Sequence, residues 1–418
     1  MATSPALTKP DFNYETATIR LTSPMLHIGS EVSQLSPFEY VDTPEKVYLP
    51  NSDLLARELL RRGRLNDYIG NIERREPITD ILETSFGDNW PQAKAVTGER
   101  IFPAHLASRN WVEGNITDLR PMIRNGMGQL YIPGSSIKGA IRTAIAYHLL
   151  KNADQYHVSP NKRVSEIEKQ LQASMGDLRR KAKFYDDKAF MDELFTNFTL
   201  KDNRGSDKIG PNTDFMRAIH VTDSEPLISK TLTARNGKKQ TFNIAVVGEV
   251  VISSRFPDWK AKFKAPIYAE LLNNVRSELT ITLDRHLLAQ FQHKNGMKLP
   301  FENLDQLLSI CQGFARRQWE LEAEYWAKIG NVNDLNIDLL WDKYYSKPDC
   351  DYDLRLGWGT GMMGTTVGSL FEPELCSQIR DTCGIPAPGF EAPKSRRTVK
   401  DARGELRYPL GWVKLKKL

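Results

Sequence analysis

The segment YIPGSSIKGAIR, residues 131–142, combines small residues with cations at a spacing that could bind phosphate. Glycine and serine open an expected helix here, and the first backbone N–H groups of a helix, at the positive end of its dipole, favour an anion. Lys138 and Arg142 are four residues apart, so they stand one turn above each other and could reach neighbouring phosphates of a passing strand. With Ser135 and Ser136 they form a candidate RNA-binding site. A well-capped amphipathic helix with solvated charges explains the same residues equally well.

A glycine-rich segment, RLGWGTGMMGTTVG, covers residues 355–368. Glycines permit positive φ and a close approach of the backbone to a ligand. A loop of this kind that carries Trp358 could wrap a nucleic-acid backbone and stack a base, at about 1–3 kcal/mol per stacked base. A cluster of tight turns without a ligand is the alternative. The candidate RNA contacts in this segment are Arg355, Gly357, Trp358, Gly359, Gly361 and Gly364.

Neither segment carries a nucleotide-cofactor motif in a suitable context. A P-loop needs Lys and then Ser or Thr after its second glycine, whereas Gly139 is followed by Ala140 and Ile141. The glycine-rich segment satisfies GxGxxG literally, but too little of the sequence follows it for a dinucleotide-binding domain. We therefore expect no ATP, NAD or FAD, and no cofactor at all.

Cations also gather near the end of the sequence, interleaved with aromatic residues. Such a run attracts phosphates, although a solvated tail without a ligand is an equally good interpretation. We expect a basic tail that begins at Lys394. Its cations are Lys394, Arg396, Arg397, Lys400, Arg403, Arg407, Lys414, Lys416 and Lys417.

Catalytic residues are harder to find. Metal-independent cleavage of RNA needs a general base and acid that titrate near neutrality, which histidine supplies most readily. None of the 7 histidines belongs to an HExxH or HxH motif. His27, beside a glycine in an expected exposed loop, is the best candidate, and Asp42 in the same loop region could position a 2′-hydroxyl or a metal. We predict a protein that is not an enzyme and has no metal site, with an endoribonuclease acting through His27 or Asp42 as the alternative.

The composition is that of a folded protein with a small excess of positive charge. Lys plus Arg number 57 and Asp plus Glu 52, a net charge of +5, so binding to nucleic acid would depend on local patches. The 4 cysteines include no CxxC pair, and we expect free, mostly buried thiols rather than zinc ligands or disulfides. No apolar run is long enough to cross a bilayer, and the N-terminus lacks a leader pattern. We expect a cytoplasmic protein without a membrane partner.

Hydrophobic periodicity predicts the elements that position these residues. Alternating polar and apolar residues indicate strands, and apolar residues three or four apart indicate helices. The expected strands cover residues 16–21, 130–133, 218–221, 242–253 and 278–284. The expected helices cover residues 51–64, 137–149 and 304–329, with a charged helical insertion over 159–201. This order favours an α+β fold of ferredoxin-like units with large helical insertions.

The same pattern divides the chain into five segments. They are an N-terminal ferredoxin-like domain (1–158), a helical insertion (159–210), a second ferredoxin-like region (211–302), a helical region (303–350), and a glycine-rich loop with a basic C-terminal segment (351–418).

Five ordered blocks spread over nearly the whole chain resemble the RAMP family of CRISPR proteins. Their combination is similar to the Csm-type terminal capping subunit of type III-A effector complexes, and a type III-B or III-D relative is the nearest alternative within the family. The blocks are LTSPMLHIGSE (21–31), YIPGSSIKGAIRTA (131–144), DFMRAIHVTDS (214–224), RLGWGTGMMGTT (355–366) and PLGWVKL (409–415).

This resemblance implies RRM-like RAMP domains that cap the backbone filament of an antiviral ribonucleoprotein at the 3′ end of its guide RNA. The implied partners are guide (CRISPR) RNA, target RNA, adjacent RAMP backbone and small subunits, and host nucleases that mature the guide. In such complexes the backbone subunits cut target RNA with a loop aspartate and a metal, and the capping member is regarded as non-cleaving. The resemblance also implies that residues 357–368 and the GSSIKG helix start face RNA.

Overall fold

A large mixed β-sheet runs through the middle of the protein. The computed structural model describes residues 13–74, 76–181, 187–201, 210–233, 236–255, 261–262, 266–329, 336–384 and 386–418. The main path of the sheet has the strand order β14, β17, β1, β12, β10, β4, β3, β2. These strands are β1 (Tyr14–Leu26), β2 (Val41–Asp42), β3 (Lys46–Tyr48), β4 (Ala107–Asn110), β10 (Ile244–Arg255), β12 (Ile267–Asp284), β14 (Leu354–Arg355) and β17 (Trp412–Lys417). Helices pack against this sheet, which confirms the predicted α+β class.

The longest pairing in the sheet joins β1 to β12 in antiparallel register, from Tyr14 opposite Asp284 to Leu26 opposite Leu272. The strand β1 is longer than the one predicted over residues 16–21, and it runs through Ser23-Pro24 to Leu26. Proline removes only one N–H from the ladder, and the side-chain amide of Asn273 donates a hydrogen bond of 3.2 Å to the Pro24 carbonyl. The strand therefore continues past the proline.

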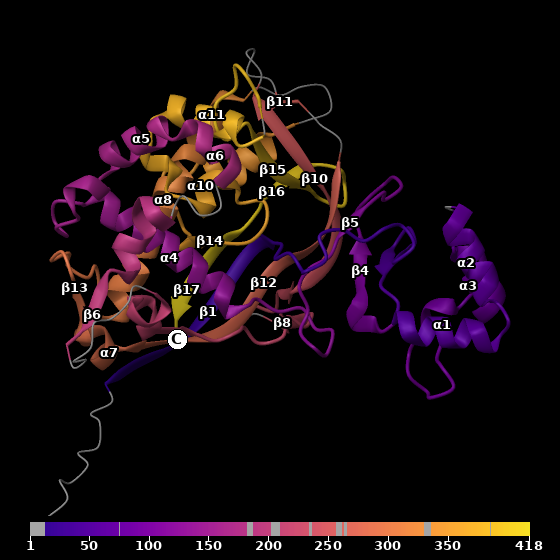
Figure 1. Ribbon diagram of the computed structural model, residues 1–418. Helices are drawn as coiled ribbons and strands as arrows, with labels where there is room; N and C mark the ends of the chain where they lie inside the picture. Colours follow the sequence, from indigo (N-terminus) through magenta and orange to yellow (C-terminus); the bar gives the residue numbers. More distant parts are fainter. Residues whose placement is uncertain are drawn as a thin grey trace, which may run out of the picture.

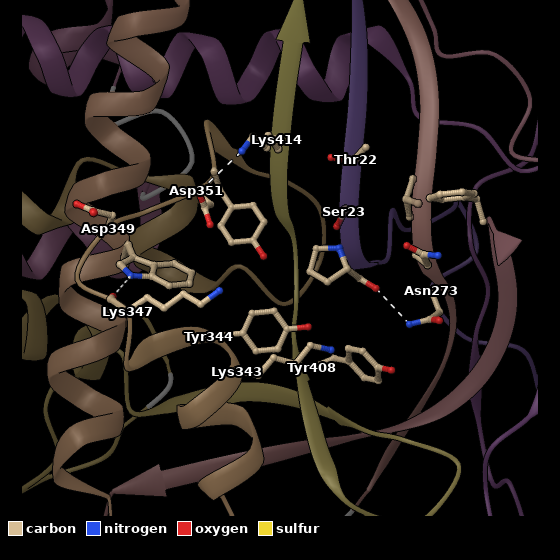
Figure 2. A pocket seen from close by; sticks show the side chains of 16 residues that line it. Thr22, Ser23, Asn273, Lys343, Tyr344, Lys347, Asp349, Asp351, Tyr408 and Lys414 are labelled. Atoms are coloured by element: carbon tan, nitrogen blue, oxygen red, sulfur yellow. Dashed lines mark hydrogen bonds and ion pairs between the residues drawn. The ribbon is translucent and has the colours of Figure 1, made fainter. Parts of the chain in front are cut away.

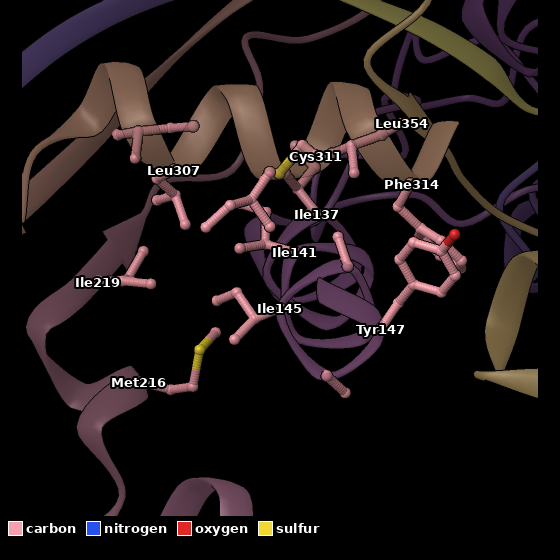
Figure 3. Close-up of a cluster of buried hydrophobic side chains, with 14 of the residues drawn as sticks. Ile137, Ile141, Ile145, Tyr147, Met216, Ile219, Leu307, Cys311, Phe314 and Leu354 are labelled. Atoms are coloured by element: carbon pink, nitrogen blue, oxygen red, sulfur yellow. The ribbon is translucent and has the colours of Figure 1, made fainter. Parts of the chain in front are cut away.

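Helices α4 (Gly134–Lys151) and α8 (Leu304–Lys328) cover one face of the sheet. Figure 3 shows Ile137, Ile141 and Ile145 of α4 beside Leu307 and Cys311 of α8. Both helices were predicted from this apolar spacing. The same core takes in the alternate residues of β1, and burying each such side chain stabilises the fold by about 1.5–3 kcal/mol.

A small helical lobe lies beyond β4, away from α4 and α8 (Figure 1). It contains α1 (Ser52–Arg61), α2 (Leu65–Arg74) and α3 (Thr79–Phe86), and α1 confirms the helix predicted over 51–64. Asn51 caps α1, because its side chain accepts a hydrogen bond from the Leu54 N–H at 3.2 Å. The lobe has its own core, made of Val41, Leu55, Leu59, Ile78, Leu82, Trp90, Ile101 and Phe102.

The remaining elements were partly predicted. The insertion predicted over 159–201 is helical over most of its described residues, but it ends in a short strand at 198–200. Strands stand at 219–221 and 244–255 close to the predicted positions, and the strand predicted over 278–284 begins earlier, at 267. Residues 130–133 are not a strand, although Ile132 and Leu130 accept hydrogen bonds from Ser224 and Leu227. The other elements are α5 (Val164–Ala173), α6 (Met175–Lys181), α7 (Arg285–Gln290), α9 (Asp338–Leu340), α10 (Gly361–Thr365), α11 (Pro373–Thr382), η1 (Trp90–Gln92), η2 (Ala104–Leu106), η3 (Pro160–Lys162), η5 (Asp187–Thr196), η6 (Pro211–Thr213), η7 (Phe215–Ala218), η8 (Trp341–Tyr345), η9 (Gly368–Leu370), β5 (Leu119–Arg120), β6 (Phe198–Leu200), β7 (Ile219–Val221), β8 (Lys230–Thr233), β9 (Lys239–Phe242), β11 (Ala261–Lys262), β13 (Phe291–His293), β15 (Ser395–Lys400) and β16 (Leu406–Pro409).

The basic segment that begins at Lys394 is not a tail but part of the folded sheet. The residues from 395 onward form β15, β16 and β17, and β17 pairs with β1 inside the main sheet. In β17 the buried Val413 and Leu415 alternate with the exposed Lys414 and Lys416, a period of two that the density of lysines obscured. The division into five segments stays a prediction, and strands of its first, third and last segments lie side by side in this sheet.

Candidate nucleic-acid interface

The glycine-rich segment packs closely on the end of β1. The Trp358 N–H donates a hydrogen bond of 3.0 Å to the His27 carbonyl. Gly357 has φ +79°, and a Cβ there would lie 2.2 Å from the same carbonyl oxygen. Gly357 is therefore required by the protein's own backbone. Gly359 and Gly364 are also packed against side chains, whereas Gly361 is exposed with open space around it.

Two guanidinium groups lie over the indole of Trp358. The Cζ of Arg397, on β15, is 4.4 Å from the centroid of the indole, and the Cζ of Arg120, on β5, is 5.1 Å away. The ring of His27 meets the indole edge-on at 5.3 Å. Arg120, Trp358 and Arg397, which we call the Trp358 cluster, are each partly exposed. The cluster therefore offers a ring and two cations to a ligand.

The positive charge of the Trp358 cluster is not neutralised locally. Among the described residues, no carboxylate lies within ion-pair distance of Arg120 or Arg397. Burial, and after it the charge of Arg120, lowers the pKa of Arg397, yet a guanidinium stays protonated at physiological pH. A phosphate placed between the two groups would offset their mutual repulsion, and arginine suits this ligand by its geometry.

His27 is buried, contrary to the prediction of an exposed loop. Its side chain is 2% exposed, and its Nδ1 lies 2.6 Å from the Glu270 carbonyl oxygen. Because a carbonyl can only accept, Nδ1 carries the proton of a neutral ring. Burial lowers the pKa of His27 and keeps the ring neutral. The arrangement orients the imidazole against Trp358 and explains the residue structurally.

Asp42 is exposed on β2 and lies far along the sheet from His27. The strands β12, β10, β4 and β3 separate β2 from β1 in the sheet order. The structure therefore does not bring the two candidate catalytic residues together. Among the described residues, no three His, Cys, Asp or Glu side chains are grouped as a metal site. The four cysteines are free thiols, and three of them are buried. No described helix is long and apolar enough to cross a membrane.

The start of α4 is occupied by the protein itself. The Gly134 N–H donates to the Asp223 carboxylate at 2.8 Å, and a Cβ on Gly134 would lie 2.3 Å from the Val221 carbonyl oxygen. A carboxylate at this position repels a second anion. The predicted phosphate position at this helix start is thus already filled. Ser135 is exposed and Ser136 is partly exposed.

Arg142 and Lys138 differ in their surroundings. Arg142 pairs with Asp214 at 2.6 Å and lies 3.9 Å from the centroid of the Phe195 ring. These contacts favour the structural interpretation of Arg142. Lys138 is half-buried, and burial lowers its pKa although Asp214 acts in the opposite direction. Lys138 stays a predicted RNA contact.

Arg355 is buried rather than presented to a ligand. Its side chain lies 3.5 Å from the Glu322 carboxylate of α8, and its Nε donates to the Leu410 carbonyl at 3.2 Å. Arg396 reaches the same carboxylate at 2.6 Å. Although burial alone would raise it, Arg396 and Arg355 hold the pKa of Glu322 below its usual value. This buried triad fixes the residues that lead into Trp358 and Arg397, and we leave Arg355 out of the candidate interface.

Sequence reasoning found Trp358 and counted Arg397 among the basic residues, but it missed Arg120. No motif surrounds Arg120, which reaches the cluster because β5 pairs with β12. A long-range pairing of this kind leaves no signal in the neighbouring residues.

The comparison with protein families gives the context for this site. The model of the RAMP superfamily matches residues 18–361. The chain belongs to the RAMP superfamily. As a member of that superfamily it shares 24% identity over 160 residues with the "CRISPR system Cms protein Csm5" of Enterococcus italicus. That alignment spans 32% of this chain and 46% of the relative, so this chain covers less than half of that relative's length.

Solved structures also resemble this RAMP protein. A chain from the cryo-EM structure of a Csm–crRNA–target RNA ternary complex of a type III-A CRISPR-Cas system has a TM-score of 0.61 and 22% identity, covering 96% of this chain and 100% of its own. The crystal structure of T. onnurineus Csm5 has a TM-score of 0.56 and 20% identity to this chain. The match covers 95% of this chain and 99% of the T. onnurineus chain. At this identity the likeness concerns the fold.

Proposed function

We propose that this RAMP protein is a non-catalytic subunit of a type III-A CRISPR effector, which binds guide RNA and caps the backbone filament at the 3′ end of the guide. Its partners would be guide RNA, target RNA and the adjacent RAMP and small subunits. Nucleases that mature the guide would dock on the assembled complex. The protein would act in antiviral defence in the cytoplasm.

Similarity to two kinds of protein supports the proposal. The curated relative is a Csm5, although the alignment covers 46% of it. A structural neighbour that covers 96% of this chain belongs to a complex described as containing crRNA and target RNA. A subunit with the same fold in the same kind of assembly would contact the RNA that the assembly contains.

The Trp358 cluster is the observation that carries the RNA-binding part of the proposal. Among the described residues no carboxylate pairs with Arg120 or Arg397, whose Cζ atoms lie 5.1 and 4.4 Å from the centroid of the Trp358 ring. Binding would combine phosphate contacts from the guanidinium groups with stacking on the indole, and it would depend little on base sequence.

The test measures binding of a fluorescently labelled guide RNA at several salt concentrations. The double variant Arg120→Gln/Arg397→Gln should bind more weakly, and its salt slope should fall by about 1.4, at about 0.7 per phosphate contact. Trp358→Ala should weaken binding by about 1–3 kcal/mol, a factor of about 5 to 150. Arg142→Gln is the matched control, because its partner Asp214 already neutralises it.

Two results would contradict the proposal. One is an unchanged salt slope in the double variant, which would remove the cluster from the RNA interface. The other is a wild-type protein that binds no guide RNA, either alone or with its RAMP neighbours, which would remove the function itself.

A further inference from the structure

The face of β1 turned away from α4 and α8 carries polar and basic side chains. Thr18, Arg20 and Thr22 alternate with the buried Ile19 and Leu21, so they lie on this opposite face. The pairing register extends the face across both neighbouring strands. It places Lys416 of β17 beside Arg20, and it places Lys414 of β17 and Arg276 of β12 on either side of Thr22. These cations form a basic row across three strands. Within it Arg20 is paired with Glu278 of β12 at 2.8 Å and Lys414 with Asp351 at 3.8 Å. Among the described residues, no carboxylate lies within ion-pair distance of the other two cations, Lys416 and Arg276.

A pocket of about 550 Å³ lies at the end of the basic row, between β1, β12 and η8 (Figure 2). This volume is in the range of sites for small ligands. Tyr344 and Tyr408 contribute aromatic rings, and Lys343, Lys347 and Lys414 contribute cations. Asn273 of β12 closes the opposite side (Figure 2). Asp349 and Asp351 also line the pocket, and Asp351 pairs with Lys414 at 3.8 Å (Figure 2). The rings, the amides and the two other lysines suit an aromatic ligand that carries an anionic group.

Lys343 has no close anionic partner. Its Nζ lies 5.1 Å from the ring centroid of Tyr344 and 5.0 Å from that of Tyr408. Burial, and after it the charge of Arg407, lowers the pKa of Lys343. The nearby Asp401 is itself paired with Arg407 at 3.2 Å. In the part of the chain that the structure describes, no carboxylate is within ion-pair distance of the Lys343 ammonium.

The hydroxyl of Tyr344 is a second group without a partner. The side chain is 5% exposed, and its oxygen makes no hydrogen bond to any described residue. Figure 2 shows this hydroxyl directed across the pocket towards Asn273. A buried hydroxyl without a partner is unusual in proteins, because its desolvation is not offset. The pocket thus presents an unsatisfied donor and an unpaired cation side by side.

We propose that this pocket receives one nucleotide of a single-stranded RNA that crosses the basic row, with its base against the tyrosine rings and its phosphate on Lys343. The proposal rests on the RNA-binding function proposed above and adds a site separate from the Trp358 cluster. The hydroxyl of Tyr344 donates to the ribose or the base. An acidic peptide would satisfy the lysines but would leave the ring faces unused, so RNA fits the lining better.

The experiment uses the full chain and a fluorescently labelled oligouridylate of twelve nucleotides. Lys343→Met should weaken binding about tenfold or more and reduce the salt slope by about 0.7. Tyr344→Phe should weaken binding about 2- to 10-fold without lowering the melting temperature, since its hydroxyl has no partner to lose. Lys169→Met is the control for loss of a lysine charge, because Lys169 is exposed on α5 and paired with Glu166 at 2.6 Å.

A second control separates binding from folding. The Tyr40 hydroxyl donates a hydrogen bond of 2.8 Å to the Ile116 carbonyl, so Tyr40→Phe should lower the melting temperature and leave RNA affinity unchanged. Loss of RNA affinity without loss of melting temperature in Tyr344→Phe, and the reverse in Tyr40→Phe, would support the pocket as an RNA site. A 4-thiouridine in the probe should also crosslink to the peptide that contains Tyr344 or Tyr408.

Three results would overturn the inference. They are wild-type affinity in both pocket variants, competition by a polyglutamate peptide as strong as that by the unlabelled oligouridylate, and crosslinks confined to other segments. If the pocket variants bind normally while Arg120→Gln/Arg397→Gln does not, the pocket fails and the proposed function stands. If the wild-type protein binds no RNA, the proposed function fails first.

Discussion

Replacing Glu322 with Gln should both destabilise the protein and weaken RNA binding. Glu322 is 3% exposed on α8, and it neutralises Arg355 and Arg396, which are also buried. Removing one member of a buried ion pair typically costs about 3–5 kcal/mol, because the remaining charge is left without compensation. At about 2.1 cal/mol/K of unfolding entropy per residue, a chain of 418 residues loses about 3–6 °C of melting temperature if it unfolds in one transition.

Loss of Glu322 should also affect RNA binding, because both of its arginine partners are close in sequence to residues of the Trp358 cluster. Arg355 leads into the loop that holds Trp358, and Arg396 immediately precedes Arg397, so the triad fixes two sides of the Trp358 cluster from α8. Glu322→Gln should therefore weaken guide RNA binding even at temperatures where the variant is folded. The assay is thermal unfolding by circular dichroism together with fluorescence polarisation at 20 °C below the observed transition.

The pH dependence gives an independent check. Because the folded pKa of Glu322 is below its unfolded value, its contribution to stability is present above the unfolded value of about 4.3 and is lost as pH falls through the folded pKa. Wild-type protein should lose stability in this acid range more steeply than Glu322→Gln. Glu324→Gln, an exposed neighbour on the same helix, is the matched control. A melting temperature equal to that of the control would refute the reasoning.

Three further predictions concern His27, two glycines of the glycine-rich segment, and Asp42. The folded pKa of His27 is lowered by burial, so its contribution to stability is complete above about pH 6.5 and is lost as pH falls below that value; His27→Gln should flatten the unfolding profile between pH 5 and 7, and an unchanged slope would contradict burial of a neutral ring. Gly357→Ala places a Cβ against the His27 carbonyl at positive φ and should lower the free energy of unfolding, measured in urea, by more than about 1–3 kcal/mol. Gly361→Ala meets no atom but must still adopt φ +70°, so it should lower that free energy by only about 1–2 kcal/mol. Cleavage of labelled RNA by the assembled complex should be the same with His27→Gln or Asp42→Asn as with wild type, and loss of cleavage in either variant would favour the endoribonuclease.

The long helices and several central strands were predictable, because they depend on local periodicity. The isoleucines of α4 and the apolar residues of α8 repeat every three or four positions and are buried as expected. The strands of the basic C-terminal segment were not predicted, because its many cations obscure the alternation of buried and exposed residues in β17. The extension of β1 beyond Pro24 depends on Asn273, a partner remote in sequence, and no local pattern could predict it.

The candidate site was predictable only in part. The sequence identified the residues that could bind an anion, but it could not tell which of them the fold already neutralises. Arg142 and Arg355 find carboxylates on other elements, whereas Arg397 does not. Their residue types are identical, so the difference lies entirely in tertiary contacts. Arg120 likewise belongs to the site because of a tertiary contact, the pairing of β5 with β12.

The pairing of β17 with β1 has a consequence for biosynthesis. Ile19 lies opposite Lys417, so β1 is flanked by a strand that is synthesised much later. Until then, the β17 side of β1 exposes unpaired backbone groups that could pair with another chain. Contacts between such distant segments also slow folding. During synthesis the nascent chain would therefore pass through an aggregation-prone interval, and its productive folding would benefit from a chaperone or from neighbouring subunits assembling on it early.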